Sequence, residues 1–492
     1  MRAAESAVMT EPGTAAVLDD AQIFRRLLIN AATLLGAYVL PRALTFAAAL
    51  VAARVLGPAS FGAYGTAASY AIIVSIAATL GMLPLLVREL ARAPEQAAQV
   101  LSAAHVVKLG ASVLMLAVLI LVAREVLHYP AEIVTGAAWL GVGYVCAAFG
   151  ENLGAWFQAR EQMHVWLQAN LWFGLGSGLA GITLVLVTRS VPWFCAAFAF
   201  GQLAALAWLL KRMPPAVRAW SPTAFADAKR LVRATAPFAV AFFALTVFYK
   251  IDVLLLERMQ PAQTVGLYAA GYKLFDVAHA LAVVAAAAIY PRLSRSRAHE
   301  RAAGRSLEVF LIAGALAAGG LMLMRSPITH VLFGSAYRET SMVLALLAPA
   351  LIGLGINILA GYLLSVADRI GVLAVWYAVA TGLKLLLAFW WIPTSGANGM
   401  AAAALASELA LALGLTFSLA RLGAGAPRAR FGVVALTGML AAYACTVLPG
   451  GPVVQLVVFV GTSAVIYASA GVLSADERRA LFAAVLPRGR TP

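Results

Sequence analysis

The residues best suited to chemistry in this chain are charged side chains inside long apolar segments. The stretch from Phe248 to His279 contains two lysines, Lys250 and Lys273, and two aspartates, Asp252 and Asp276. An ionisable group at the centre of a membrane helix costs about 2.5–3.5 kcal/mol, so such groups usually pair or face a wet cavity. Ammonium groups in a cavity can hold an anion, and carboxylates can bind and release a cation.

Three basic residues are candidates to bind an anionic substrate: Arg42, Lys250 and Lys273. Arg42 is the most suitable, because a guanidinium stays charged and can bind phosphate oxygens in a bidentate fork. If the first span covers residues 27–51, Arg42 lies about 21 Å along it, past the middle of the membrane. We expect the two lysines in the middle or outer half of the membrane as well.

Three carboxylates are candidates to bind and release a coupling ion: Asp252, Asp276 and Glu408. The alternative is that each only neutralises a lysine. Lys273 and Asp276 stand three residues apart and can pair on one helix, and Lys384 could pair with Glu408. The sequence leaves both possibilities open.

Lys108 and Glu151 lie closer to the predicted cytoplasmic ends of their spans. Lys108 can extend its ammonium to the lipid headgroups. We expect Glu151, beside Asn152, to meet water.

The composition places these charges in a membrane protein. The chain of 492 residues is 63% hydrophobic and 12% charged, about half the charged fraction of a soluble domain. Apolar runs of roughly 20 residues recur, enough to cross about 30 Å of hydrocarbon. The runs are continuously apolar, which predicts helices rather than barrel strands. The first 24 residues lack the order of a signal peptide and are expected to form a cytoplasmic tail.

We therefore predict an all-α polytopic membrane protein with about fourteen transmembrane helices. The approximate spans are 27–51, 62–86, 100–122, 132–156, 165–187, 192–210, 234–256, 265–290, 307–324, 341–365, 370–391, 397–419, 431–448 and 453–473.

Two parts of the chain resemble each other at an offset of about two hundred residues. Leu56–Tyr64 resembles Met259–Tyr268 with one residue inserted, and Pro84–Leu86 corresponds to Pro291–Leu293. Internal duplication of a multi-span unit is typical of transporters, which hold the substrate between two halves. This predicts two related lobes that face each other across a cavity.

The polar connections then divide the chain. The connection 211–233 carries six basic residues, and no charged residue occurs from Phe431 to Ser474. The predicted parts are a cytoplasmic tail (1–26), an N-terminal six-helix lobe (27–210), a cytoplasmic linker (211–233), a C-terminal six-helix lobe (234–420), a terminal helix pair facing lipid (421–473) and a cytoplasmic tail (474–492).

The basic residues predict the orientation. With both termini cytoplasmic, 25 of the 36 lysines and arginines lie in cytoplasmic segments, 6 in outer segments and 5 in spans. This asymmetry explains the net charge of +15 without a nucleic-acid partner. The three cysteines form no C-x-x-C pattern and no H-E-x-x-H motif occurs, so we expect no metal and no cofactor.

Several motifs, in order over roughly residues 27–420, resemble the oligosaccharide flippase family. These are the polysaccharide biosynthesis transporters of the multidrug/oligosaccharidyl-lipid/polysaccharide exporter superfamily. The motifs are Ala53-Arg54-Val55-Leu56-Gly57-Pro58, Phe61-Gly62, Tyr64, Gly81, Asp252-Val253-Leu254-Leu255, Val265-Gly266-Leu267-Tyr268, Ala270, Tyr272-Lys273, Pro291-Arg292-Leu293-Ser294, Leu332-Phe333-Gly334-Ser335-Ala336-Tyr337, Gly396-Ala397-Asn398-Gly399 and Ser407-Glu408.

The resemblance implies two pseudosymmetric six-helix bundles plus a terminal helix pair in a bacterial cytoplasmic (inner) membrane. It implies a polyprenyl-pyrophosphate-linked oligosaccharide as substrate, moved from the inner to the outer leaflet for surface polysaccharide synthesis. The expected partners are this lipid, membrane lipids, and the polysaccharide polymerase and glycosyltransferases of the same pathway.

Four other functions are alternatives. A lipid II flippase is the nearest alternative and differs only in its substrate. A multidrug antiporter of the same superfamily should have an acidic cavity for organic cations. A membrane glycosyltransferase would need acidic or histidine residues on a sizeable outer loop, whereas the outer segments here are short. A structural scaffold would not explain why the chain bears the energetic cost of placing Arg42, Lys250 and Lys273 inside the membrane. We therefore expect a transporter and not an enzyme.

The charge asymmetry predicts that positions 218 and 297 are cytoplasmic and that position 338 is external. Single cysteines replacing Arg218, Arg297 and Arg338 in a cysteine-free background test this with an impermeant thiol reagent. We expect labelling from outside intact cells only at position 338. Labelling of position 218 or 297 under these conditions would refute the topology.

Overall fold

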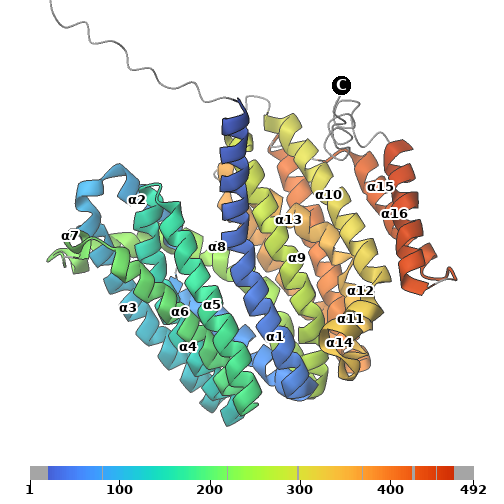
Figure 1. Ribbon diagram of the computed structural model, residues 1–492, viewed down its shortest axis with the longest axis horizontal. Coiled ribbons are helices and arrows are strands. Elements are labelled where there is room, and N and C mark those ends of the chain that lie inside the picture. The colour runs from blue at the N-terminus through green and yellow to red at the C-terminus, as the bar shows by residue number, and fades with distance from the viewer. Residues whose placement is uncertain are drawn as a thin grey trace, which may run out of the picture.

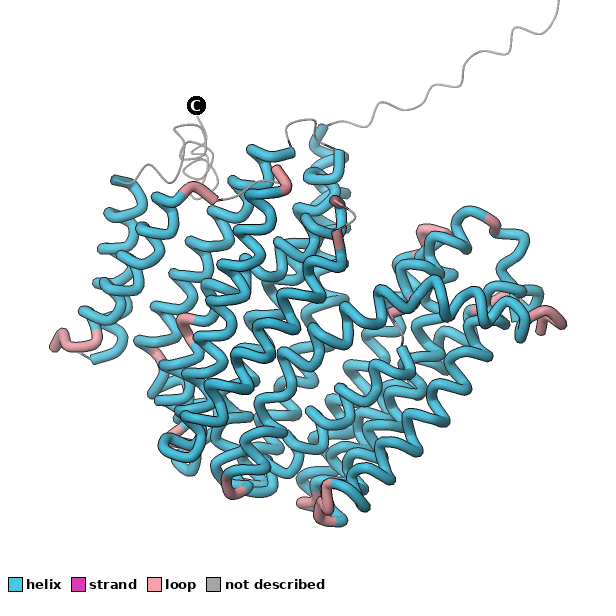
Figure 2. The backbone as a smooth tube through the Cα atoms, turned by 180° about the vertical axis from the view of Figure 1, so that it is seen from behind, coloured by secondary structure: helices cyan, strands magenta, loops and turns pink. Residues whose placement is uncertain are grey.

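A computed structural model of the chain describes residues 20–469, apart from 80, 219, 296–298, 368, 424–426 and 450. The described residues form helices joined by short turns and include no strand (Figure 2). Of the predicted tail 1–26, residues 1–19 lie outside the described residues, and the rest belongs to a helix that begins at Asp20. The predicted tail 474–492 lies outside them entirely.

The elements follow in this order: α1 (Asp20–Thr79), α2 (Leu83–Arg92), η1 (Pro94–Gln96), α3 (Ala97–Leu121), η2 (Val122–Val126), α4 (Ala131–Ala159), α5 (Met163–Thr188), α6 (Val191–Arg212), α7 (Pro215–Arg218), α8 (Ala224–Met259), α9 (Ala262–Arg295), α10 (His299–Leu323), α11 (Arg325–Phe333), η3 (Ser335–Tyr337), α12 (Thr340–Leu347), α13 (Ala350–Val366), α14 (Ile370–Arg421), α15 (Ala429–Cys445) and α16 (Gly451–Ser469).

Among the described residues, nine helices are long and apolar enough to cross a membrane. The pair α12 and α13, bent by 49°, would make a tenth. Two long helices each contain a kink, α1 at Gly57 (φ 75°) and α14 at Gly396 (φ 52°). These kinks lie where the sequence predicts turns between spans. The all-helical membrane fold is thus confirmed, and the count of fourteen crossings stays a prediction.

Two segments differ from the sequence-based expectation. In the second predicted span, 62–86, the first helix ends at Thr79, because Gly81 takes a left-handed φ of 59°. A separate helix, α2, begins at Leu83 with Pro84 in its first turn. The predicted linker 211–233 contains α7 and the beginning of α8. From Ala224 onward this connection is one continuous helix with the seventh predicted span.

The helices form two groups (Figure 1). We call α1–α6 the first lobe and α8–α14 the second lobe. The two lobes lie close together at one end, which we call the apex. Helices α2–α6 diverge from the second lobe toward the opposite side, and α1 stands between the two groups. Helix α1 begins and α16 ends on that opposite side, here named the terminal side. This common position agrees with an even number of crossings.

The backbones of the two lobes meet at the apex. A side chain at Gly62 would overlap the carbonyl oxygen of Ala262 and would lie 2.9 Å from the amide nitrogen of Gly266. A side chain at Gly266 would in turn overlap the carbonyl oxygen of Pro58. These are the repeated segments of the sequence, and each contacts the other's equivalent position. Such reciprocal contacts are the property of a twofold axis.

Side chains add further bonds between the lobes at this end. The Tyr337 hydroxyl donates to the carbonyl oxygen of Ala53 over 2.8 Å, and both groups are buried. The Arg54 guanidinium donates to the carbonyl oxygen of Leu332 over 2.9 Å and to that of Val331. The apex is therefore held by backbone contact and by hydrogen bonds to backbone carbonyls.

The last two described helices lie at the edge of the second lobe, where α15 and α16 pack beside α10 (Figure 1). The buried carboxylate of Glu308 accepts a hydrogen bond from Arg428 Nε over 3.0 Å and pairs with Arg305 at 3.2 Å. Val433 and Leu440 of α15 leave their side chains exposed. The pair therefore presents an apolar face suited to lipid.

The apex contact predicts that Gly266→Val separates the lobes, because the new side chain would overlap the backbone of Pro58. We expect a loss of about 1–3 kcal/mol in the stability of the closed apex. The measurements are thermal unfolding in detergent and the distance between spin labels placed at Ala59→Cys and Gln263→Cys.

Gly110→Val is the matched control, because a Cβ atom added there has no neighbour within 4 Å beyond the backbone of its own helix. An unchanged label distance and unfolding temperature in Gly266→Val would contradict the apex contact.

Candidate functional site

A cavity of about 290 Å³ lies between the two lobes. The first lobe lines it with Thr45, Tyr64, Ser69, Tyr144, Phe173 and Phe198, and the second with Tyr249, Lys250, Tyr272, Lys273 and Asp276. Most of the lining is apolar or aromatic, with a few convergent charged groups, as is usual for ligand sites. We call it the central cavity.

Helices α8 and α9 bring the charged residues together, because they run antiparallel through a tight turn after Met259. The Lys250 ammonium lies 2.8 Å from the Asp276 carboxylate, and their side chains are 22% and 36% exposed. Lys250 also lies 5.1 Å from the centre of the Tyr272 ring. Asp276 thus pairs with Lys250, and the alternative ion pair with Lys273 is not formed.

Lys273 instead contacts the first lobe. Its ammonium lies 5.4 Å from the centre of the Tyr64 ring, a cation–π arrangement. The central cavity therefore holds two ammonium groups against one carboxylate, that of Asp276.

A second set of charges is buried behind this lining. The Lys384 ammonium lies 2.9 Å from the Asp252 carboxylate, and their side chains are 2% and 1% exposed. Lys384 also donates to the carbonyl oxygen of Phe248 over 2.6 Å, and the Tyr268 hydroxyl donates to Asp252 over 2.7 Å. The possible pair of Lys384 with Glu408 is thus replaced by a pair with Asp252. Such a fully bonded pair offsets the cost of burying two charges.

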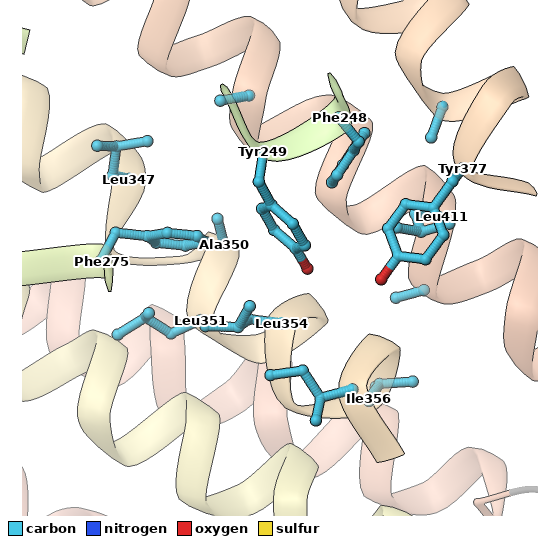
Figure 3. Close-up of a cluster of buried hydrophobic side chains, with 14 of the residues drawn as sticks. Phe248, Tyr249, Phe275, Leu347, Ala350, Leu351, Leu354, Ile356, Tyr377 and Leu411 are labelled. Atoms are coloured by element: carbon cyan, nitrogen blue, oxygen red, sulfur yellow. The ribbon is translucent and has the colours of Figure 1, made fainter. Parts of the chain in front are cut away.

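Glu408 is buried in the second lobe, with 3% of its surface exposed. Its carboxylate accepts hydrogen bonds from Asn357 Nδ2 (2.8 Å) and from the Tyr249 hydroxyl (3.3 Å). Within the described part of the chain it has no ion-pair partner. Figure 3 shows Tyr249 and Tyr377 turned toward one another in the same buried cluster. Because Tyr249 also lines the central cavity, it connects the cavity to this carboxylate.

Arg42 does not line the central cavity. It lies one turn of α1 before Thr45, which does, and Thr45 Oγ1 donates to its carbonyl oxygen over 3.0 Å. The helix continues to Gly57, so Arg42 lies about 22 Å from that kink along α1. Its side chain is exposed. Arg42 is therefore nearer the terminal side than Thr45 is.

The aromatic residues of the lining were not predicted as site residues, although Tyr64 and Tyr272 stand in motifs that the sequence analysis quotes. Tyr272 could have been found from its position beside Lys273, whereas Tyr64 has no charged residue near it in the sequence. Lys108 was expected to reach the headgroups, but its side chain is 0% exposed and lies 2.8 Å from Glu151. Among the described residues, no group of three potential metal ligands occurs.

Comparison with known proteins identifies the family of the chain. The model of the polysaccharide biosynthesis protein family matches residues 27–297. No curated protein matches the sequence.

Three solved structures share the fold. The lipid II flippase MurJ in an inward closed conformation is 14% identical, covers 91% of this chain and 98% of its own, and has a TM-score of 0.69. An inward-facing multidrug resistance MATE family transporter of the MOP superfamily is 13% identical, with coverages of 78% and 95% and a TM-score of 0.62. A mutant of the Vibrio cholerae MATE transporter VcmN is 12% identical, with coverages of 82% and 98% and a TM-score of 0.57.

At these identities the structural similarity concerns the fold alone. The family model, in contrast, matches more than half of the sequence in the region that holds α1–α9. The chain belongs to the polysaccharide biosynthesis protein family.

Proposed function

We propose that this protein is a flippase that moves a polyprenyl-pyrophosphate-linked oligosaccharide from the inner to the outer leaflet of a bacterial cytoplasmic membrane. The observation that carries the proposal is the cationic excess of the central cavity, where Lys250 and Lys273 face a single carboxylate. A pyrophosphate without compensation is prohibitively costly inside hydrocarbon, so its carrier must supply fixed positive charge. Membership of the polysaccharide biosynthesis family supports this substrate class.

In the empty cavity, Asp276 neutralises Lys250. A pyrophosphate that enters would compete with Asp276 for this ammonium, as a stronger anion with more acceptor oxygens. Lys273 would turn from the Tyr64 ring toward the same phosphate. Because Lys273 and Tyr64 belong to different lobes, substrate binding would change the contact between the lobes and so favour one conformation over another.

Arg42 would act before the lysines. It precedes the cavity-lining Thr45 on α1, a helix that begins on the terminal side. We propose that the cytoplasm lies on this side. The exposed guanidinium of Arg42 can hold a phosphate in a bidentate manner as the headgroup leaves the inner leaflet.

We propose both termini to be cytoplasmic, with the six-helix lobes at 27–210 and 234–420 on either side of the linker.

Coupling to a cation gradient would use a carboxylate that can lose its charge. Asp252 and Asp276 are each bonded to a lysine, whereas the described residues that bond the Glu408 carboxylate, Asn357 and Tyr249, are neutral donors. A proton or cation at Glu408 would alter its bond to Tyr249, which lines the central cavity. We therefore propose Glu408 as the first candidate for the coupling site, ahead of Asp252 and Asp276.

Two alternatives differ in chemistry or in substrate. A multidrug antiporter for organic cations requires a cavity rich in carboxylates, which the two lysines of the central cavity oppose. A lipid II flippase would use the same cationic cavity with another glycan.

We also propose that the polymerase and glycosyltransferases of the pathway work alongside this protein.

The test of function is deletion of the gene followed by lipid extraction. We expect a polyprenyl-linked oligosaccharide to accumulate on the inner leaflet, and complementation to remove it. Arg42→Ala should fail to complement at normal membrane levels, and Arg42→Lys should complement in part, because lysine keeps the charge but not the bidentate geometry. Lys250→Ala and Lys273→Ala should each reduce transport.

Arg124→Ala serves as the matched control, since this arginine is 76% exposed and, in the described part of the chain, forms an ion pair only with the neighbouring Glu125. Accumulation of lipid II in the deletion strain, in place of a polyprenyl-linked oligosaccharide, would identify lipid II as the substrate. Full transport by a correctly inserted Arg42→Ala variant would refute its proposed role.

The coupling proposal predicts that an imposed proton or sodium gradient does not accelerate transport by Glu408→Gln. The reason is that an amide cannot bind and release a proton or a cation as a carboxylate can. Flipping in proteoliposomes with and without each gradient measures this. Glu125→Gln, on the exposed surface, is the control. Indifference of the wild-type protein to both gradients would exclude this role for all three carboxylates.

A further inference from the structure

A second cavity, of about 210 Å³, lies within the first lobe between α4, α5 and α6. Its lining includes Cys146, Glu151, Trp166, Asn170, Phe173 and Gln202. None of these residues has a role in the transport scheme above. We call it the lobe cavity.

The lobe cavity continues the central cavity toward the terminal side. Phe173 lines both. On each of the three helices, residues that line the two cavities follow one another at helical spacing on a single face. These stripes are Leu140, Tyr144, Ala147 and Glu151 on α4, Ser177, Phe173, Asn170 and Trp166 on α5, and Phe194, Phe198, Gln202 and Leu206 on α6. The two cavities are thus neighbouring parts of one groove.

The polar groups of the lobe cavity retain bonding capacity. Glu151 uses one carboxylate oxygen for Lys108, and its other oxygen has no hydrogen-bond partner among the described residues. Asn170 uses only its amide nitrogen, which donates to the Trp166 carbonyl oxygen over 3.0 Å. The Gln202 amide makes no hydrogen bond within the described part of the chain. Donors and acceptors therefore remain for a ligand.

These groups stand beside two aromatic rings, those of Trp166 and Phe173. A sugar ring offers hydroxyl groups around its edge and apolar C–H groups on its faces, which suits amides and a carboxylate beside aromatic surfaces. No described residue of the lining is basic, and the Lys108 ammonium is fully buried behind Glu151. Lys108 and Glu151 neutralise each other, so the lining offers no further positive charge to an acidic sugar.

We propose that the lobe cavity is a subsite for an uncharged sugar of the glycan, filled while the central cavity holds the pyrophosphate. This inference rests on the proposed function, because it takes a lipid-linked oligosaccharide as the substrate. The lobe cavity then selects among glycans, and the lysines of the central cavity bind the part that all such lipids share.

Cys146 provides a reporter inside the lobe cavity. It is partly exposed, whereas Cys195 and Cys445 are buried. The experiment uses the purified full-length protein and measures the rate of Cys146 alkylation by N-ethylmaleimide with mass spectrometry. The probes are polyprenyl diphosphate without sugar and the same lipid bearing a hexose, an N-acetylhexosamine or a hexuronic acid. Binding of each lipid is measured in parallel.

We expect at least one lipid with a neutral sugar to slow alkylation about tenfold relative to the sugar-free lipid, and the hexuronic acid lipid to give no such protection. Gln202→Ala and Asn170→Ala should each reduce the protection by about fivefold, as expected for one lost hydrogen bond. Neither variant should alter binding of the sugar-free lipid. Gln168→Ala, an amide on α5 outside the lining, is the matched control.

The outcomes separate the two proposals. Lys250→Ala should weaken binding of every lipid, including the sugar-free one, because it removes a phosphate partner. If binding depends on Lys250 but no neutral sugar protects Cys146 better than the sugar-free lipid, the sugar subsite is refuted and the proposed function stands. If no lipid binds, or if binding is independent of Lys250, both proposals are refuted.

Discussion

The backbones of Gly62 and Gly266 lie so close together at the apex that neither position has room for a side chain. Each glycine meets the carbonyl oxygen of the other lobe's equivalent segment, so the contact is reciprocal. Tyr64 and Lys273 follow within two helical turns of these glycines, and the Lys273 ammonium lies 5.4 Å from the centre of the Tyr64 ring. The central cavity therefore begins where side chains first separate the lobes, and its position depends on this contact.

The low polarity of the membrane interior sorts the charges around the cavity into two sets. Asp252 and Lys384 are fully buried and satisfy each other, with Tyr268 and a backbone carbonyl completing their bonds. Lys250 and Asp276 remain partly exposed. Among the described residues, this arrangement leaves Lys273 without an ion pair to a carboxylate. The excess positive charge of the cavity is thus a result of pairing, not of the number of lysines alone.

Tyrosine hydroxyls connect the central cavity to Glu408. The Tyr272 hydroxyl donates to the carbonyl oxygen of Tyr249, and the Tyr249 hydroxyl donates to Glu408. A change at Glu408 therefore has a short route of contacts to Lys250, which lies over the Tyr272 ring. In the first lobe, the groove that holds Phe173 extends the same site along three helices. Charge recognition and glycan recognition would then occupy different lobes.

The amino-acid sequence by itself determined the class of fold. Apolar runs of membrane-spanning length require helices, because the backbone has no other bonding partner in lipid. The internal repeat at Leu56–Tyr64 and Met259–Tyr268 predicted two related lobes, and these two segments form the reciprocal contact of the apex. The family motifs led to the same family that the comparison finds over residues 27–297.

Only the tertiary structure decided which charges pair. Spacing along a helix allowed Lys273 to bond Asp276, but Lys250, 26 residues away, takes that carboxylate because α8 and α9 lie antiparallel. Lys384 bonds Asp252 across 132 residues for a similar reason. The kink at Gly57 and the length of α1 likewise set the place of Arg42. Sequence patterns report which side chains avoid lipid, whereas the packing of helices distant in sequence decides what each of them meets.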